Sequence, residues 1–311
     1  MQQTTVGQLF EDNREKLQLT HVSGSLDALI KATDESVWPA DLVGHMNQMH
    51  LNRLQVVGAA EIAWAARQPP ERMRNRMDEI AQVRPPAIIM ADGCEVIEAT
   101  ARMSAETGVA VFTTSLPSAS VIDLLRLYLS RALAERTTLH GVFMDVLGLG
   151  VLITGESGAG KSELALELIT RGHGLVADDI VEVFRVAPET LEGRCPELLM
   201  DFLEVRGLGL INIRTIFGET ARRRKMRLRL IVHLQKPSPG VPEATRLPLD
   251  DQTQVVIGVP IRRVVLPVAA GRNLAVLLEA AVRTTVLMLR GIDANKEFID
   301  RQRRAIDGQD I

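Results

Sequence analysis

The chain has 311 residues, 36 Lys and Arg against 39 Asp and Glu, and a net charge of −3. Its length predicts two domains or one large one, and 46% hydrophobic with 24% charged residues is typical of globular proteins, which excludes wholesale disorder. The near-neutral charge and an aromatic content of only 3% disfavour a dedicated nucleic-acid binder with base-stacking surfaces.

Residues 1–134 alternate strand-like and helix-like segments. The pattern predicts strands at 54–58, 87–90 and 109–113, and helices at 95–107 and 118–134. Strands that alternate with helices predict a small α/β domain with a parallel sheet. Its residues suggest no catalytic constellation, so this domain receives no function from the sequence.

Residues 135–311 form a second predicted α/β domain that is richer in strands. Its predicted elements are a hairpin over 141–154, a strand over 226–235, a proline-rich loop over 234–251 and a buried helix over 273–289. Gly148 and Gly150 are expected to supply the hairpin turn. Apolar residues of the 226–235 strand alternate with others that include Arg227 and Arg229, which predicts a half-buried strand.

The chain carries no sign of export or of a membrane span. Its first ten residues lack the basic start and apolar core of a signal peptide, and its most apolar segment, 273–289, contains charged residues. Cys94 and Cys195 lie far apart without CxxC spacing, which disfavours a disulfide framework and a structural zinc site. We expect a soluble, cytoplasmic protein that binds neither membrane nor nucleic acid.

One segment matches the phosphate-binding pattern G-x-x-x-x-G-K-[ST] between a predicted strand and a predicted helix. It comprises Gly155, Glu156, Ser157, Gly158, Ala159, Gly160, Lys161 and Ser162. Backbone amides of such a loop and the following helix N-terminus attract phosphates. Lys161 would contact the β- and γ-phosphates of a nucleotide, and the Ser162 hydroxyl would bind Mg²⁺. The alternative is an ordinary glycine-rich turn.

Carboxylates in two further segments are candidate site residues. Asp178 and Asp179 follow an apolar strand, and adjacent carboxylates near a phosphate raise each other's pKa, which suits a group that accepts and returns a proton. Either aspartate can instead cap a turn. Glu204 and Arg206 are a candidate Mg²⁺ ligand and phosphate clamp, or else form a mutual salt bridge. His140 is an isolated histidine, more typical of a surface or capping residue.

Basic residues outside the loop have competing interpretations. The run 222–225, with Arg227 and Arg229, is predicted to be the solvated face of a strand, with a docking surface for an acidic or phosphorylated partner as the alternative. Segment 271–273 would cap the last apolar helix or contact a second phosphate. Arg246, in the proline-rich loop, would close over a donor phosphate.

Together these residues resemble the HPr kinase/phosphorylase family, strongly over 136–290 and more loosely over the N-terminal part. Segments 139–141, 155–163, 171–179 and 267–273 are similar to family segments in the same order. A further segment looks like the family signature: Leu203, Glu204, Val205, Arg206, Gly207, Leu208, Gly209, Leu210, Ile211 and Asn212.

The resemblance implies a C-terminal P-loop kinase domain with a phosphoenolpyruvate carboxykinase-like nucleotide-binding core. It implies that ATP or pyrophosphate phosphorylates a serine of the phosphocarrier protein HPr, and that inorganic phosphate removes it again to give pyrophosphate. Lys161 and Ser162 would hold phosphate and Mg²⁺, with Glu204 as second metal ligand. Asp179 would be the base and, in reverse, the acid. The resemblance adds His140 and Arg246 as catalytic positions, and a homohexamer.

One stretch departs from the family pattern. Pro267, Val268, Ala269, Ala270, Gly271 and Arg272 match a stretch linked to dephosphorylation, in which many members carry arginine where this chain has Ala269. Loss of an arginine removes a charge and a fork of donors. We expect the kinase direction to survive and the change to act on phosphorolysis.

Two other functions use the same loop. A P-loop kinase for a small metabolite or another protein would not need the 203–212 signature. A nucleotide-gated regulatory module would not need Asp179 as a base. A DNA-linked ATPase is disfavoured by the net charge of −3 and the few aromatic residues.

Overall fold

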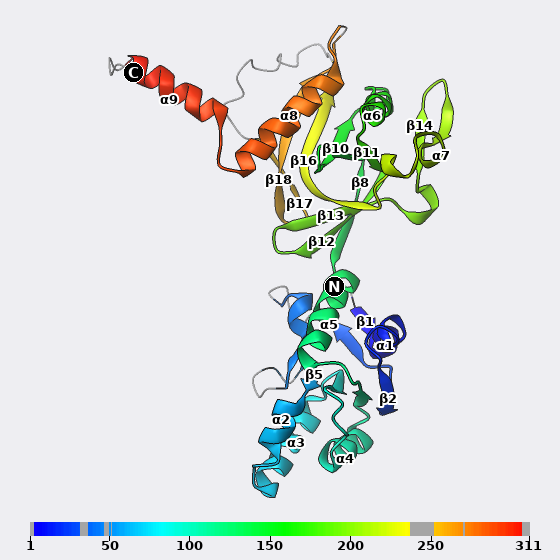
Figure 1. Ribbon diagram of the computed structural model, residues 1–311, viewed down its shortest axis with the longest axis vertical. Coiled ribbons are helices and arrows are strands. Elements are labelled where there is room, and N and C mark those ends of the chain that lie inside the picture. The colour runs from blue at the N-terminus through cyan, green and yellow to red at the C-terminus, as the bar shows by residue number, and fades with distance from the viewer. Residues whose placement is uncertain are drawn as a thin grey trace. The chain divides into compact units, whose positions relative to one another are not determined.

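The computed structural model describes residues 3–31, 37–46, 50, 52–236, 252–269 and 271–306. The chain divides into two compact units, residues 1–135 and 136–311, and each is a mixed α/β structure (Figure 1). Within the described segments, no helix is both long enough and apolar enough to cross a membrane.

The N-terminal unit is built on a five-stranded sheet in the order β2-β7-β6-β5-β4. Strands β4 to β7 are parallel, whereas edge strand β2 is antiparallel to β7. The sheet strands are β2 (Thr20–Ser23), β4 (Val43–His45), β5 (Leu54–Val57), β6 (Ala87–Met90) and β7 (Ala110–Thr113). The three predicted strands are therefore confirmed, and the antiparallel edge was not foreseen.

Helices cover both faces of this sheet. Two apolar clusters, one on each face, explain why the central strands are continuous apolar runs. The first cluster holds α1 (Val6–Asn13) and α5 (Ser118–Ala132), and the second holds α2 (Ala59–Ala65), α3 (Pro70–Val83) and α4 (Glu98–Thr107). Smaller elements are β1 (Gln3–Thr5), paired with β3 (Leu29–Lys31), and the 3-10 turn η1 (Pro39–Leu42).

The C-terminal unit has a nine-stranded sheet in the order β11-β9-β10-β16-β13-β12-β8, with β18 beside β16 and β17 beside β18. Its strands are β8 (Glu135–His140), β9 (Val142–Val146), β10 (Leu149–Gly155), β11 (Gly174–Ala177), β12 (Ile180–Ala187), β13 (Thr190–Arg194), β16 (Lys225–Gln235), β17 (Thr253–Val256) and β18 (Val259–Pro267). Strands β10, β16 and β18 run parallel, so their carboxyl ends meet at one edge.

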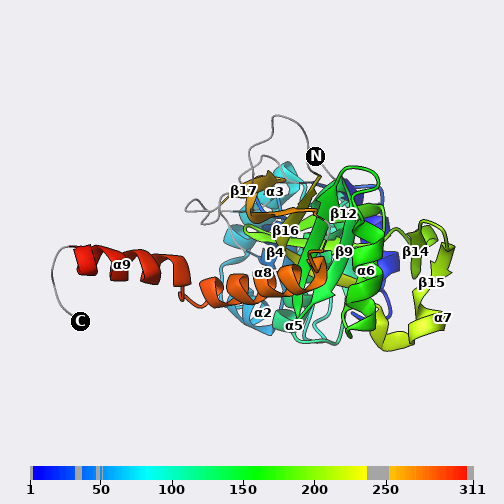
Figure 2. The same cartoon turned by 90° about the horizontal axis from the view of Figure 1, so that it is seen from above.

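Helices α6 (Lys161–Thr170) and α8 (Leu274–Leu289) pack on one face of this sheet in a large apolar cluster. A second cluster lies on the other face, which is why Ile231 of β16 is fully buried although the period-two pattern placed it on the outer face. Helix α9 (Ala294–Ile306) projects away from the sheet beyond the end of α8 (Figure 2).

The predicted hairpin exists as β9 and β10, but one glycine has a different role from the expected one. Leu147 and Gly148 make the turn with φ of 54° and 83°. Gly150 lies within β10, where a Cβ atom would sit 2.1 Å from the carbonyl oxygen of Arg227. Gly150 thus permits the close approach of β10 to β16.

Candidate active site

The glycine-rich loop joins β10 to α6, as the motif requires. Gly158 and Gly160 have φ of 69° and 88°, a left-handed conformation that glycine adopts without a steric penalty. Gly155 passes so close to β16 that a Cβ there would lie 2.7 Å from the carbonyl oxygen of Leu234. Lys161 Nζ donates to the carbonyl oxygens of Gly155 and Glu156, both at 3.1 Å. The loop is therefore held at the carboxyl edge of the sheet, where α6 begins.

Two further cations reach this loop from other elements. Lys236, just after β16, donates from Nζ to the carbonyl oxygen of Ser157 at 2.7 Å. A Cβ atom built on Gly158 would lie 3.1 Å from Nη1 of Arg206 and 3.5 Å from Nζ of Lys236. Both cations thus flank the same glycine, and with Lys161 they concentrate positive charge where a phosphate would bind.

The 203–212 segment forms the hairpin that carries Arg206 to the loop. Its strands are β14 (Phe202–Val205) and β15 (Gly209–Asn212). Leu203 and Val205 are buried in the core of the unit, so the alternating Glu204 and Arg206 are exposed. Among the ion pairs of the described residues, none joins Glu204 to Arg206, which removes the mutual salt bridge as an explanation. Asn212 then caps α7 (Ile213–Phe217) by accepting from the Thr215 amide at 2.9 Å.

Three carboxylates gather beside the loop, at the end of β11. Oδ2 of Asp178 accepts a hydrogen bond from the Glu204 amide at 2.8 Å, which ties the hairpin to β11. Burial raises the pKa of Asp178, and the charges of Asp179 and Glu204 add to this effect. The sequence predicted mutual charge repulsion, whereas burial is the larger cause. Asp178 is half-buried while Asp179 is exposed, so the two neighbours occupy different environments.

His140 is the last residue of β8, and a backbone hydrogen bond of the following residue joins this strand to the segment that carries the carboxylates. The amide of Gly141 donates to the carbonyl oxygen of Asp179 at 3.1 Å. The His140 side chain is exposed. The fold therefore brings β8, β11 and the 203–212 hairpin together, although they are separate in sequence.

A polar cleft of about 240 Å³ lies on the other side of the loop, at the carboxyl ends of β16 and β18. Its lining includes Glu156, His233, Lys236 and Arg263. His233 Nδ1 is 3.0 Å from the Thr154 hydroxyl, and burial together with the nearby Arg263 lowers the His233 pKa. No local motif marks these residues. The available signal is topological, because ligands of parallel sheets bind at the carboxyl ends of strands.

Segment 267–272 follows β18 and borders the start of α6. The Val268 amide donates to the Gln235 carbonyl oxygen at 2.8 Å, and a cleft of about 480 Å³ has both Gly160 and Arg272 in its lining. Asn273 caps α8 by accepting from the Val276 amide at 2.9 Å, as one interpretation of the sequence expected. Arg246 and Ala270 lie outside the described residues.

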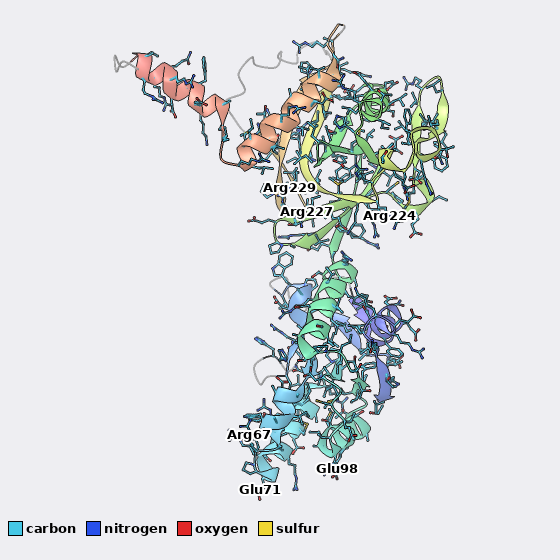
Figure 3. The ribbon with its side chains drawn as sticks, viewed as in Figure 1. Arg67, Glu71, Glu98, Arg224, Arg227 and Arg229 are labelled. Atoms are coloured by element: carbon cyan, nitrogen blue, oxygen red, sulfur yellow. The ribbon has the colours of Figure 1, made fainter. Side chains whose placement is uncertain are left out.

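The basic run 222–225 is largely engaged in ion pairs within the unit, while Arg224 and Lys225 are exposed, as expected for a solvated face. The pairs are Arg222 with Asp201 and Glu219, Arg223 with Asp145, and Lys225 with Glu192, at 2.8–2.9 Å. Arg224, Arg227 and Arg229 lie along the segment that enters and begins β16 (Figure 3). Arg227 is exposed and Arg229 is half-buried, as expected for that strand.

The sequence matches two family models along most of its length: "HPr Serine kinase N terminus" over residues 4–129 and "HPr Serine kinase C-terminal domain" over residues 131–302. It is 63% identical over 309 residues to the HPr kinase/phosphorylase of Aromatoleum aromaticum, covering 99% of both chains. It is 64% identical over 308 residues to that of an Azoarcus species, covering 99% of this chain and 98% of the relative.

Among solved structures, the Hpr(Ser) kinase/phosphatase of Coxiella burnetii is similar with a TM-score of 0.47 and 35% sequence identity, over 52% of this chain and 98% of that one. Both family models and the full-length relatives agree with the resemblance found in the site residues. The chain belongs to the HPr kinase/phosphorylase family.

Proposed function

We propose that this enzyme transfers a phosphoryl group from ATP or pyrophosphate to a serine of HPr, and that it reverses the modification by phosphorolysis with inorganic phosphate, giving pyrophosphate. The carrying observation is the convergence of the glycine-rich loop, two flanking cations and three carboxylates at one edge of the C-terminal sheet. Phosphoryl transfer needs mainly positioning and charge stabilisation, which such an arrangement supplies.

In this proposal the 155–162 segment is a P-loop in a phosphoenolpyruvate carboxykinase-like core. Its amides and Lys161 bind the donor phosphates, and Arg206 and Lys236 stabilise negative charge at the transferred group. His140 is an additional catalytic group beside the carboxylates. Arg246 completes the catalytic residues carried over from the family.

Asp179 is the proposed proton acceptor for the serine hydroxyl. It is exposed at the end of β11 and accessible to an incoming side chain, whereas Asp178 is engaged with the Glu204 amide. In the phosphorolysis direction the same carboxylate returns the proton to the serine oxygen.

The oxygen donors suit magnesium as the metal ion. The Ser162 hydroxyl and the Glu204 carboxylate are hard ligands, and Mg²⁺ commonly takes only one or two protein ligands besides phosphates and water. Among the described residues, no group of three or more His, Cys, Asp or Glu side chains is placed to hold a metal ion. The ion would neutralise charge on the phosphates when bound.

The surface beside the loop supports a protein substrate rather than a small metabolite. Leu208 and Leu210, on the hairpin that carries Arg206, are 67% and 66% exposed. Exposed apolar side chains that flank a phosphate site offer contact area to a protein partner. We further propose a cytoplasmic homohexamer that binds neither nucleic acid nor membrane. Light scattering on the purified protein tests the hexamer.

The deciding assay incubates the enzyme with Mg²⁺, ATP and HPr and locates the phosphate by mass spectrometry. We expect phosphoserine, and we expect Asp179→Asn to abolish transfer while ATP still binds. Asp123→Asn, an exposed aspartate on α5, is the matched control and should retain activity. Normal transfer by Asp179→Asn would eliminate Asp179 as the base.

A second assay tests the reverse direction. Phosphorylated HPr with inorganic phosphate should yield pyrophosphate, and Ala269→Arg should lower the phosphate concentration needed for half-maximal rate by restoring a donor fork. An unchanged phosphate dependence would show that residue 269 does not contribute to phosphate binding.

A further inference from the structure

The N-terminal unit contains its own cavity, independent of the proposed kinase site. It measures about 230 Å³ and is lined by residues of this unit alone, including Val57 at the end of β5 and residues of α2, α3 and α4. Met46, which follows β4, also borders it. The cavity thus opens at the carboxyl ends of parallel strands, which is where open α/β sheets bind ligands.

The walls of the cavity favour a flat apolar group. Trp64 of α2 faces the same space as Met73 and Met77 of α3. Methionine sulfur makes favourable contacts with aromatic rings, and an indole offers a face on which a second ring can stack. The volume is smaller than the 300–1,000 Å³ typical for drug-sized ligands, so a single ring with a short substituent suits it.

The hydrogen-bond donors that remain available at the cavity favour a negatively charged group on the ligand. The Arg76 guanidinium carbon lies 4.8 Å from the Trp64 ring centroid, and no hydrogen bond or ion pair found among the described residues engages it. Thr100 is only 2% exposed and lines the cavity, and none of the hydrogen bonds in the described segments includes its hydroxyl. Arg76 thus packs on the Trp64 ring, and its N–H groups, like the Thr100 hydroxyl, remain available to a ligand.

The acidic side chain at the cavity is already engaged. Glu61 Oε2 accepts from the Gly58 amide at 2.8 Å, and its Oε1 lies 3.4 Å from Nδ1 of His45. Glu61 keeps its negative charge, but both of its oxygens have partners, so the donors left for a ligand at the cavity are those of Arg76 and Thr100.

A nucleotide or another polyphosphate does not suit this edge of the sheet. The Asp92 carboxylate accepts from the amides of Ala59 and Ser118, both at 2.8 Å, and these bonds lower its pKa. A permanent negative charge thus holds the position that a phosphate would take, and it would repel several further charges. A single carboxylate directed at Arg76 avoids that position.

We propose that this cavity binds a small aromatic monocarboxylate, with its ring between Trp64 and the methionines of α3 and its carboxylate on Arg76. Guanidinium and carboxylate form charge-assisted, bidentate hydrogen bonds, and the Thr100 hydroxyl offers one more. The site gives the N-terminal unit a ligand-binding role.

The test uses the full-length enzyme with Trp38→Phe, which leaves Trp64 as the only tryptophan, since the chain has two. Phenylacetate is titrated against the tryptophan fluorescence, with phenylacetamide as the uncharged isostere. We expect saturable binding of phenylacetate, at least about fivefold tighter than that of the amide. Binding that does not saturate, or equal affinity for both probes, would overturn the proposal.

A second variant ties the preference to one side chain. Arg76→Gln should bring the two affinities within about twofold, because the carboxylate loses its cation. Arg74→Gln, which removes an exposed arginine of the same helix, should keep the preference for the acid. If Arg76→Gln retains that preference while its far-UV circular dichroism matches the parent, the assignment of Arg76 is wrong.

Discussion

Glu279 of α8 is the centre of a hydrogen-bonded ion-pair cluster that joins three elements of the C-terminal unit. Nε and Nη2 of Arg171, at the end of α6, donate to its two oxygens at 2.9 Å each. His173, just before β11, donates from Nε2 to Oε1 at 2.9 Å. The bonds from Arg171, followed by that from His173, lower the pKa of Glu279 to about 2. Replacing Glu279 by glutamine therefore removes the charge and one of the acceptors.

The expected cost follows from the geometry and the exposure. A bidentate Arg–carboxylate pair is stronger than an ordinary surface pair, but Arg171 is 34% exposed and Glu279 18% exposed, so water screens part of it. His173 is 7% exposed and would lose its charged acceptor. We expect Glu279→Gln to lower the free energy of unfolding by about 1–2 kcal/mol, which corresponds to roughly 2–8 °C in Tm for a unit of this size.

The pH dependence has a defined sign. Because the folded-state pKa is depressed to about 2 from 4.5, the stabilisation is fully present above the unfolded-state value and is lost as pH falls toward 2. Thermal unfolding followed by circular dichroism should show a Tm gap between parent and Glu279→Gln at pH 7 that narrows below pH ~4.5. Glu167→Gln is the control, because Glu167 meets Arg171 only at 3.7 Å and is 42% exposed. Equal losses in both variants, or a gap that is constant with pH, would refute the reasoning.

Three further predictions concern the active-site region. Gly158→Ala should weaken nucleotide binding by roughly tenfold in calorimetric titration without lowering Tm by more than about 2 °C, because the left-handed φ disfavours alanine and its Cβ atom would lie 3.1 Å from Nη1 of Arg206. Asp178→Asn should melt no lower than the parent, although its activity should fall. The raised pKa of Asp178 means that its ionised form costs stability at neutral pH, and asparagine can still accept from the Glu204 amide. Asp178→Ala loses this acceptor and should lower the free energy of unfolding by about 1 kcal/mol. Cys195 should resist iodoacetamide at pH 8 until urea unfolds the protein, because burial raises its pKa to about 11.

Secondary structure was predictable where burial alone decides it. Central strands such as 54–57 and 87–90 are buried on both sides and therefore appear as unbroken apolar runs. Helix α3 is not predicted by the sequence pattern, because only a narrow stripe that includes Met77 and Ile80 is buried and the remaining residues are largely charged. The antiparallel edge strand β2 is not predicted either, because its exposed residues carry no alternation.

Site residues that belong to a contiguous motif were predictable from the sequence, whereas those brought in by strand pairing were not. The loop motif is contiguous, so its strand and helix followed from the spacing of glycines and Lys161. Lys236 has no motif of its own and reaches the loop only because β16 runs parallel to β10, with Leu234 opposite Gly155. Strand pairing over such a separation is a property of the whole sheet, and a single sequence does not reveal it.

The two neighbouring aspartates show how backbone conformation separates roles that the sequence left open. Asp179 has φ of 64°, a left-handed conformation that aspartate tolerates better than most residues, and its carbonyl oxygen is held by the Gly141 amide. This turn leaves Asp179 exposed while Asp178 remains half-buried with the Glu204 amide as donor. Asp178 fixes the hairpin through the amide of Glu204, which lies in β14 rather than in a turn that follows Asp178. The turn leaves Asp179 exposed, in keeping with its proposed role as the base, so we expect Asp179→Asn to abolish transfer and Asp178→Ala to lower stability.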